Sequence, residues 1–285
     1  MPELPEVEVI RRGLIPILRG TRVTAVRTGP KELRLPVPRK DLDRWIRSAT
    51  ITELYRRGKY LLLLNNKEAV MIIHLGMTGK LGIFPAETPT ALHDHICFSL
   101  DSGQELRYND VRRFGCLQVL APGELPEKSA LTSLGPEPLP TANPEWLEPR
   151  HPAFSGRYLK QKAGKRAQPI KNFLMDNRVV VGIGNIYANE ILFLAGILPS
   201  TPVGSITSAQ WRKTAAVSKE VLEKAIKMGG STIRDYVDSS GSQGYFQLSL
   251  MVYGRAGELC RICGTPVKKE IIAGRATFIC PGCQN

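Results

Sequence analysis

Tyr60-Leu-Leu-Leu-Leu64 and Ala69-Val-Met-Ile-Ile-His74 are two short apolar runs separated by the turn residues Asn65-Asn66. Runs of this length, bounded by turn residues, are typical of strands in a sheet. The pattern recurs on both sides, at residues 22–27, 50–54, 95–100, 105–108 and 116–120. Roughly seven or eight short strands within about a hundred residues predict a β-sandwich or a flattened barrel.

Helical patterns flank this β-rich region. Before it, Val7, Ile10, Leu14 and Ile17 recur at helical spacing, and Pro16 is expected to make the last turn of that helix irregular. After it, prolines concentrated across residues 135–140 predict an extended connector. Beyond the connector we expect four helical segments, at residues 158–164, 170–177, 186–195 and 208–228, the last two stopped by glycines.

Four of the six cysteines form two pairs, Cys260-Arg-Ile-Cys263 and Cys280-Pro-Gly-Cys283. Two such pairs at this separation predict one structural zinc ion, bound by four thiolates on a short β-ribbon. Disulfides are the alternative, but nothing in the sequence indicates an oxidising compartment. Cys97 and Cys116 lie in apolar runs, so we expect them to be buried thiols.

These patterns predict an α+β chain in four parts. The parts are an N-terminal β-sandwich domain flanked by helices at residues 1–133, a proline-rich linker at 134–152, a helical domain at 153–249 and a zinc finger at 250–285. The assignment of catalysis and of DNA binding to these parts depends on the site residues considered next.

The charge balance points to the class of partner. The chain has 39 Lys and Arg against 26 Asp and Glu, a formal net charge of +13. Such an excess favours a polyanionic partner, and nucleic acid above an anionic membrane surface. No apolar run approaches the ~20 residues that span a bilayer, and no secretory signal opens the sequence. We expect a nucleic-acid partner and no membrane.

Pro2 and Glu3 follow the initiator Met1 directly. A small second residue permits removal of Met1, which would leave a free proline amine beside a carboxylate. An α-amino group titrates at roughly 8, so its neutral fraction near pH 7 is able to attack an electrophilic carbon while Glu3 transfers protons. A frayed terminus whose acidic residues favour a helix start is the alternative interpretation.

Val180-Val-Gly-Ile-Gly-Asn185 looks like the start of a dinucleotide-binding turn. The third small residue of that motif would fall at Tyr187, and no acidic residue lies between Glu190 and Glu220 to bind a ribose. We therefore expect no nucleotide cofactor. The turn remains suited to a phosphate, with Asn185 acting either there or as a helix cap.

Several other turns carry residues suited to DNA, although each has a structural alternative. Lys59 precedes an apolar strand, where a lysine is usually solvated, and Met77 lies in a glycine-bracketed loop, where a methionine is usually packed. On a DNA-binding face, however, Met77 and Phe114 are able to act as wedges between bases, with Arg112 beside them.

Two charged stretches have less specific interpretations. His93 and His95 resemble a metal pair, but no further histidine or carboxylate cluster completes a site, so a phosphate contact or a capped turn is favoured. A basic cluster follows the connector. Alone it is typical of a solvated helix face, but in a chain of net charge +13 a non-specific phosphate contact is favoured at least equally. Its members are Lys160, Lys162, Lys165, Arg166 and Lys171.

The order of these motifs resembles that of bacterial formamidopyrimidine-DNA glycosylases. The resemblance rests on residues 2–8, 74–79, 109–115 and 175–187 and on the four-cysteine tail, and it runs from Pro2 to Gln284. The opening Pro-Glu-Leu is more similar to this branch than to its sister, the endonuclease VIII type, which prefers oxidised pyrimidines.

The resemblance implies a monomeric, bifunctional DNA glycosylase and AP lyase in the bacterial cytoplasm, associated with the nucleoid. It would act on oxidised purines in damaged double-stranded DNA, chiefly 8-oxoguanine and formamidopyrimidines. Pro2 would form a Schiff base with the sugar, Glu3 would be the catalytic carboxylate, and Glu6 would support it. Lys59 and Arg275 would serve β- and δ-elimination, with the zinc hairpin placing Arg275 at the DNA.

Further DNA contacts are implied in the same way. Met77, Arg112 and Phe114 would fill the gap left by the extruded nucleotide. The resemblance also implies that His93, Arg166 and Asn185 contact the DNA backbone, with Asn185 in a helix–two-turn–helix. Lys171 would lie near the lesion. The loop at residues 237–244 resembles one that closes over the damaged base.

Two departures and three alternatives accompany this resemblance. Val111 stands where the family usually has a proline, and Lys165-Arg166 replaces a run of lysines, so either cation is a candidate for the phosphate contact. The alternatives are the sister enzyme and a non-enzymatic zinc-ribbon protein that senses distorted duplex. An RNA-processing factor ranks lower because no RNA-binding signature appears.

Overall fold

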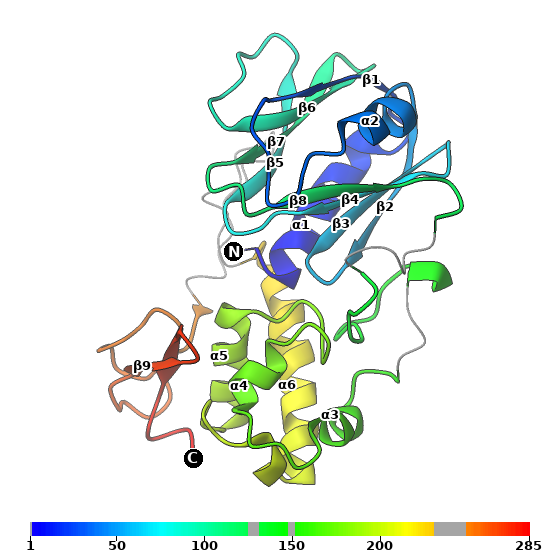
Figure 1. The fold of residues 1–285 in the computed structure, drawn as a ribbon. Coiled ribbons are helices and arrows are strands. Elements are labelled where there is room, and N and C mark those ends of the chain that lie inside the picture. The colour runs from blue at the N-terminus through cyan, green and yellow to red at the C-terminus, as the bar shows by residue number, and fades with distance from the viewer. Residues whose placement is uncertain (1, 125–130, 148–151, 231–248) are drawn as a thin grey trace. The chain divides into compact units, whose positions relative to one another are not determined.

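The computed structural model describes residues 2–124, 131–147, 152–230 and 249–285. Within these ranges the chain forms two compact units (Figure 1). The first unit holds the residues up to Thr132 together with residues 229 and 230, and the second holds Ser133–Met228 and residues 249–285. The loop that we expected at residues 237–244 lies outside the described residues.

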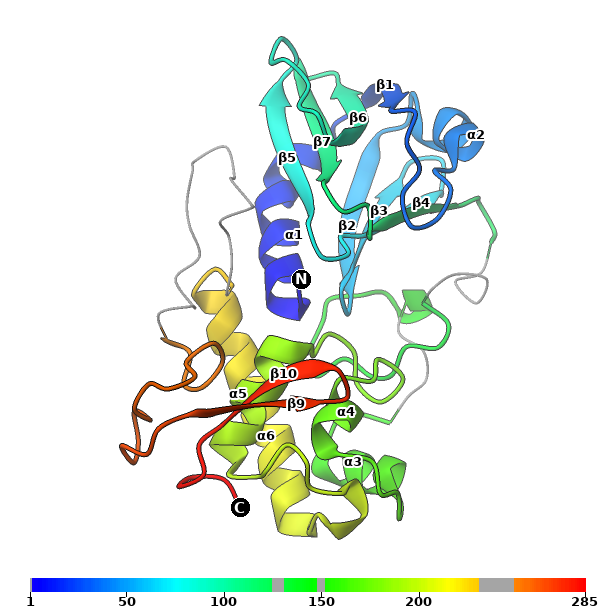
Figure 2. The same cartoon turned by 60° about the vertical axis from the view of Figure 1, so that its left-hand side comes forward.

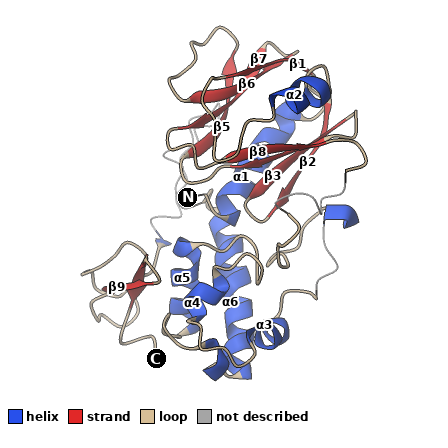
Figure 3. Ribbon diagram, in the orientation of Figure 1, coloured by secondary structure: helices blue, strands red, loops and turns tan. Residues whose placement is uncertain are grey.

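Two four-stranded antiparallel sheets build the first unit (Figure 3). Their strand orders are β1-β6-β7-β5 and β2-β3-β4-β8. The strands are β1 (Val23–Thr28), β2 (Ile51–Arg57), β3 (Tyr60–Asn65), β4 (Val70–His74), β5 (Gly79–Pro85), β6 (Asp94–Leu100), β7 (Gln104–Asp110) and β8 (Cys116–Leu120). Apolar side chains from both sheets, such as Ile73 and Phe98, pack into one core, which confirms the predicted sandwich.

Helix α1 (Leu4–Leu18) contributes its apolar face to the same core. Val7, Ile10 and Leu14 are buried as predicted, but Leu18 rather than Ile17 completes the face. The helix continues through Pro16, because the backbone N–H of Arg19 still reaches the Ile15 carbonyl at 3.1 Å.

Two features of the first unit were not expected from the sequence. Strand β5 begins at Gly79, where we expected a loop to end, and pairs with β7 along its whole length. Its glycines and Pro85 obscure a strand pattern that only the pairing with β7 supplies. A short helix α2 (Arg39–Asp41) and a π-helical turn η1 (Leu42–Ile46) also precede β2.

The second unit is helical, with a zinc ribbon (Figure 2). Its elements are η3 (Glu145–Leu147), α3 (Gly156–Ala163), α4 (Ile170–Leu174), α5 (Asn185–Ala195), η4 (Val203–Ser205), α6 (Ser208–Lys227) and the antiparallel hairpin β9 (Lys268–Ile272) and β10 (Arg275–Ile279). These elements confirm the predicted helical region and ribbon. No helix among the described residues is long and apolar enough to cross a bilayer.

The helix ends in this unit follow local rules. Thr207 and Gln210 form a reciprocal capping box at the start of α6, and Gly196 ends α5 in the left-handed region at φ 76°. Helix α4 ends three residues before the predicted end at 177. There the Asp176 carboxylate accepts from the Arg178 backbone N–H at 2.9 Å and forms a turn instead.

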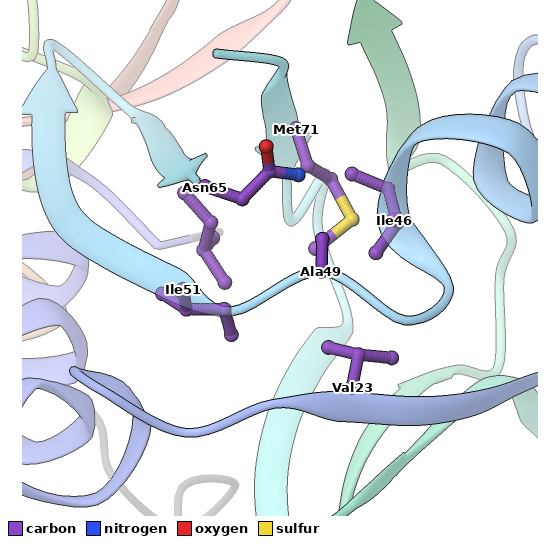
Figure 4. Close-up of a pocket in the computed structure, with 7 residues that line it drawn as sticks. Val23, Ile46, Ala49, Ile51, Asn65 and Met71 are labelled. Atoms are coloured by element: carbon purple, nitrogen blue, oxygen red, sulfur yellow. The ribbon is translucent and has the colours of Figure 1, made fainter. Parts of the chain in front are cut away.

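A gap in the core of the first unit is drawn in Figure 4. It has a volume of about 10 Å³ and is lined by Val23, Ile46, Ala49, Ile51, Leu63, Asn65 and Met71. Such a volume holds one water molecule at most. Its polar member Asn65 is already bonded, since its amide donates to the Trp45 carbonyl at 2.9 Å. The gap is a packing defect and has no room for a ligand.

A buried ion cluster ties α1 to β2. The Glu8 carboxylate accepts from Arg11 at 2.8 Å, from Arg12 at 2.8 Å and from Arg56 at 3.0 Å, and Arg56 is only 4% exposed. Burial alone would raise the pKa of Glu8, but the hydrogen bonds and charges of these three arginines lower the pKa to about 2.

Glu8→Gln should therefore destabilise the first unit by about 3 kcal/mol, because the buried Arg56 loses the carboxylate that accepts its hydrogen bond at 3.0 Å. The folded-state pKa is lowered, so the Glu8 contribution is fully present above the ordinary value of 4.5 and is lost as the pH falls through about 2. Denaturant unfolding at several pH values measures this difference. Asp43→Asn, which breaks the exposed pair with Arg47, is the control and should cost less than about 1 kcal/mol.

Candidate functional site

The N-terminal residues of α1 are anchored rather than frayed. Pro2 is half-buried, while Glu3 and Glu6 are 2% and 4% exposed. Glu3 is the N-cap of α1, and its backbone N–H donates to the Glu6 carboxylate at 2.8 Å within a reciprocal capping box. Pro2 therefore directly precedes a buried helix turn that contains two carboxyl groups. The bonds at the start of the helix fix the course of the backbone at Pro2.

Lys59 lies in the turn between β2 and β3, and it is only 6% exposed. The alternative interpretation of Lys59 as a solvated lysine is therefore wrong. Burial, together with the charges of Arg34 and Lys59, lowers the pKa of His74 to about 4. His74 is thus neutral near pH 7, and its Nδ1 accepts the Gly76 backbone N–H at 3.0 Å.

The structure brings the loop that carries Met77 against the turn that carries Arg112 and Phe114. A Cβ on Gly76 would lie 2.4 Å from the backbone of Phe114, so the two segments touch at a residue that has to be glycine. Met77 and Phe114 are 42% and 44% exposed, and the Arg112 guanidinium lies 4.6 Å from the centre of the Phe114 ring. Exposed apolar side chains beside a cation suit an inserted wedge.

His93 and His95 do not form a metal site. His95 is buried, and its Nε2 lies 2.9 Å from the Asp110 carbonyl oxygen. His93 is half-buried with its ring centre 6.3 Å from that of His95. Within the described part of the chain, only the four cysteines group as metal ligands. His95 thus lies within strand β6 and is held by the Asp110 backbone, whereas His93 precedes the strand.

Lys171 in the second unit is buried, unlike the rest of the basic cluster. It is 1% exposed, and its Nζ donates to the Ala276 carbonyl at 2.9 Å and to Thr277 Oγ1 at 2.7 Å. Burial and the charge of Arg275 lower the pKa of Lys171 to about 8. By contrast, Arg166 is exposed, and its guanidinium donates to the Lys162 carbonyl.

Helix α5 fastens the same hairpin with two asparagines. Asn185 donates from Nδ2 to the Ala276 carbonyl at 3.1 Å, and Asn189 accepts the Phe278 backbone N–H at 2.7 Å. Glu190 accepts three successive backbone N–H groups, beginning with that of Met251 at 2.8 Å. Our sequence reasoning missed Asn189 and Glu190, whose one signal was polarity inside an otherwise apolar helix.

Arg275 projects from the tip of the β9–β10 hairpin. The two turn residues Ala273 and Gly274 both have positive φ, 48° and 73°, as a type I′ turn requires. Arg275 follows them and is exposed. A hollow of about 150 Å³ lies beside it, lined by Lys171, Asn172, Met175, Asp176, Ile272 and Arg275. The Asp176 carboxylate at this hollow is already paired with Arg178, so the two cations suit an anion such as a phosphate group.

The four cysteine sulfurs fit a zinc ion. All four Sγ atoms lie within 4.8 Å of one another, with Cys260 and Cys283 at 3.9 Å and Cys263 and Cys280 at 3.3 Å. Tetrahedral zinc with Zn–S bonds of about 2.3 Å places its sulfurs about 3.8 Å apart. Four thiolates complete the coordination, so the metal is structural and orders the module that carries Arg275.

Three family models match the chain along its length. They are the formamidopyrimidine-DNA glycosylase N-terminal domain at residues 1–117, the formamidopyrimidine-DNA glycosylase H2TH domain at 146–237, and the zinc finger found in FPG and IleRS at 257–285. The helix–two-turn–helix that we expected around Asn185 lies within the second match.

Curated relatives and solved structures agree with these models. Formamidopyrimidine-DNA glycosylases of Methylococcus capsulatus and Magnetococcus marinus are 46% and 43% identical, each over the full length of both chains. A Lactococcus lactis Fpg bound to DNA with an abasic site has a TM-score of 0.87 at 33% identity, with 99% of each chain covered. A Lactococcus lactis Fpg variant bound to Fapy-dG DNA has a TM-score of 0.88 at 33% identity, with full coverage of both chains. The chain belongs to the formamidopyrimidine-DNA glycosylase family.

Cys263→Ser should abolish stoichiometric zinc and destabilise the second unit by several kcal/mol, on the order of 5, since folding of such modules depends on the metal. Metal analysis and thermal unfolding measure both effects. Cys97→Ala, in the first unit, is the matched control and should keep one zinc per chain. Full zinc content in Cys263→Ser would contradict the assignment.

Proposed function

We propose that this chain is a bifunctional enzyme that excises oxidised purines from duplex DNA and then cleaves the strand. Its family membership makes it a DNA glycosylase of base excision repair. The lyase step and the preference for 8-oxoguanine and formamidopyrimidines are the finer parts of the proposal. Similar proteins bound to DNA that contains Fapy-dG, an abasic site or carbocyclic 8-oxo-G support it.

Glu3 is the observation that carries this proposal. Its carboxyl group is held almost entirely out of water at the start of α1, next to Pro2. A secondary amine and a fixed proton carrier are what an imine-forming lyase needs at one place. The capping bond from Glu3 to Glu6 fixes the backbone there, so Glu6 supports the site without taking part in the chemistry.

The first step transfers the sugar from the base to Pro2. The lone pair of the Pro2 nitrogen attacks C1′, and the glycosidic bond breaks with its electron pair going to the base nitrogen, which takes up a proton from water. Glu3 moves protons between the proline nitrogen and the sugar ring oxygen, so that the ring opens and an iminium ion remains on Pro2. This step requires Met1 to be absent, because an amide nitrogen is not nucleophilic.

Strand cleavage follows by two eliminations. Loss of a C2′ proton expels the 3′ phosphate, and a second elimination expels the 5′ phosphate, after which water releases the sugar fragment from Pro2. We assign Lys59 to the first elimination and Arg275 to the second. The burial of Lys59 supports a role in proton transfer, and the exposure of Arg275 at a hairpin tip supports phosphate binding.

Other residues hold the DNA in this proposal. Met77, Arg112 and Phe114 fill the space left by the extruded nucleotide, as their exposure and contact suit them to do. His93, Arg166 and Asn185 contact the backbone, and Lys171 lies near the lesion. Lys171 lies in α4 and is buried against the hairpin, so we assign its contribution to the hollow that it lines together with Arg275.

The organisation that we propose keeps the four parts at residues 1–133, 134–152, 153–249 and 250–285. A single chain carries every residue that the reaction needs, so a monomer suffices. We also propose that the enzyme works without a nucleotide cofactor in the bacterial cytoplasm, at the nucleoid.

Borohydride added to the protein with 8-oxoguanine·cytosine duplex should reduce the iminium ion to a stable covalent adduct. Pro2→Gly should lose the adduct. Glu3→Gln should excise 8-oxoguanine about 10²–10⁴-fold more slowly but still form an adduct at a preformed abasic site. Peptide mapping identifies the crosslinked residue, and an adduct on a chain that retains Met1 would contradict the mechanism. Faster cleavage of thymine-glycol duplex would instead indicate the sister specificity.

Arg275→Ala should leave the β-elimination product and reduce the δ-elimination product. It should also weaken DNA binding and lower the salt dependence by about one phosphate contact. Gel analysis of product ends and binding at several salt concentrations measure these effects. Lys268→Ala, on the other strand of the same hairpin, is the control and should keep both products.

A further inference from the structure

Asp110 ends strand β7 and, among the described residues of the first unit, is the most deeply buried carboxyl group, at 0% exposed. Its side chain accepts Thr78 Oγ1 at 2.6 Å, the Gly115 backbone N–H at 2.9 Å and the Tyr108 hydroxyl at 3.4 Å. Among the described residues, no cation forms an ion pair with it. Hydrogen bonds from two surface segments therefore compensate this buried acceptor.

Two of these bonds, those from Thr78 and Gly115, reach segments that carry proposed DNA contacts, while Tyr108 lies in β7 itself. Thr78 is the neighbour of Met77, and its hydroxyl oxygen also accepts the Arg112 backbone N–H at 3.1 Å. Gly115 follows Phe114 directly. One carboxyl group thus bonds on one side to the loop with Met77 and on the other to the turn with Arg112 and Phe114.

The backbone of Asp110 extends the same connection. Its N–H donates to the His93 carbonyl at 3.1 Å, and its carbonyl accepts the Arg113 N–H at 3.3 Å. The same carbonyl lies 2.9 Å from Nε2 of His95. A third segment, the one with His93, is therefore bonded to this residue.

The two segments around Asp110 approach the Tyr108 hydroxyl so closely that no side chain fits between them. A Cβ on Gly115 would lie 1.7 Å from the Tyr108 hydroxyl, and one on Gly79 would lie 2.9 Å from it. Burial and the charge of Asp110 raise the pKa of Tyr108, so the hydroxyl keeps its proton and donates it. The glycines at the ends of both motifs are there to let the two segments close around this hydroxyl.

We propose that Asp110 is a positioning residue that holds the loops of Met77, of Arg112 and Phe114, and of His93 in one arrangement, so that they enter the DNA together when the damaged nucleotide is extruded. The inference rests on the proposed function and extends it. Asp110 touches no reacting atom, and its carboxyl group acts through Thr78 and the Gly115 backbone. Its loss should slow extrusion of the base and leave the chemistry at Pro2 intact.

Two variants test this role and a third is the control. In Asp110→Asn, the amide N–H₂ replaces one acceptor, so either the Gly115 N–H loses its bond or the Thr78 hydroxyl no longer donates and has to accept from the amide. Thr78→Val keeps the shape of the side chain and removes the link between Asp110 and Arg112, in case Asp110→Asn folds poorly. Thr52→Val is the matched control, because Thr52 is equally half-buried and donates only to the Leu64 carbonyl at 3.2 Å.

The measurements separate extrusion from chemistry. Single-turnover excision of 8-oxoguanine should fall about 10–100-fold in Asp110→Asn and less in Thr78→Val, as expected for a displacement near 1 Å. Incision at a preformed abasic site, where no base has to be extracted, should change less than about threefold. The fluorescence rise of 2-aminopurine placed beside the lesion should slow by the same factor as excision. Thr52→Val should match wild type in all three.

Three outcomes decide the matter. Equal losses of excision and abasic incision, in step with a lower melting temperature, would show a purely structural role and overturn the proposal. Excision and fluorescence in Thr78→Val that equal those of Thr52→Val would overturn it as well. A wild-type protein that gives no borohydride adduct would contradict the proposed function instead. The 2-aminopurine fluorescence on DNA binding would then still show whether extrusion is slower in Asp110→Asn than in wild type.

Discussion

Burial of acidic side chains in the first turns of α1 is the constraint on which the first unit depends. Glu3, Glu6 and Glu8 are each less than a tenth exposed, and none of them is left without compensation. The capping box uses the free N–H groups of the helix start, while Arg56 brings a strand to Glu8. A terminus that would otherwise fray becomes a rigid point, and Pro2 is held at that point.

In the second unit, a hairpin rather than a helix end is held in a fixed position. Zinc fixes the base of the ribbon through four cysteines, and buried polar side chains fix its strand. Lys171 and Asn185 both donate to the Ala276 carbonyl, and Asn189 accepts from Phe278. Arg275 can therefore be exposed on a tight turn without being mobile at its root, because the strand behind it is bonded along its length.

Polar groups buried beneath exposed loops are the common principle in both units. Asp110 lies under the Met77 and Phe114 segments as Lys171 lies under Arg275. A buried hydrogen bond has few alternative partners, so it holds a loop in one position more strictly than an apolar contact does. Surface residues that have to meet a ligand in a fixed geometry benefit from such support.

Sequence alone determined the strand-rich half, the helical half, the zinc cysteines and the family motifs, because periodicity, turn residues and cysteine spacing are local signals. It also indicated Pro2, Glu3, Met77, Arg112 and Phe114. Only the tertiary structure decided that Lys59 and Lys171 are buried, that β5 begins at Gly79, and that Asp110, Asn189 and Glu190 are bonded to segments far away in the chain. These features depend on partners far away in the chain. The local sequence of a charged or glycine-rich stretch does not indicate which distant residues will pack against it or bond to it.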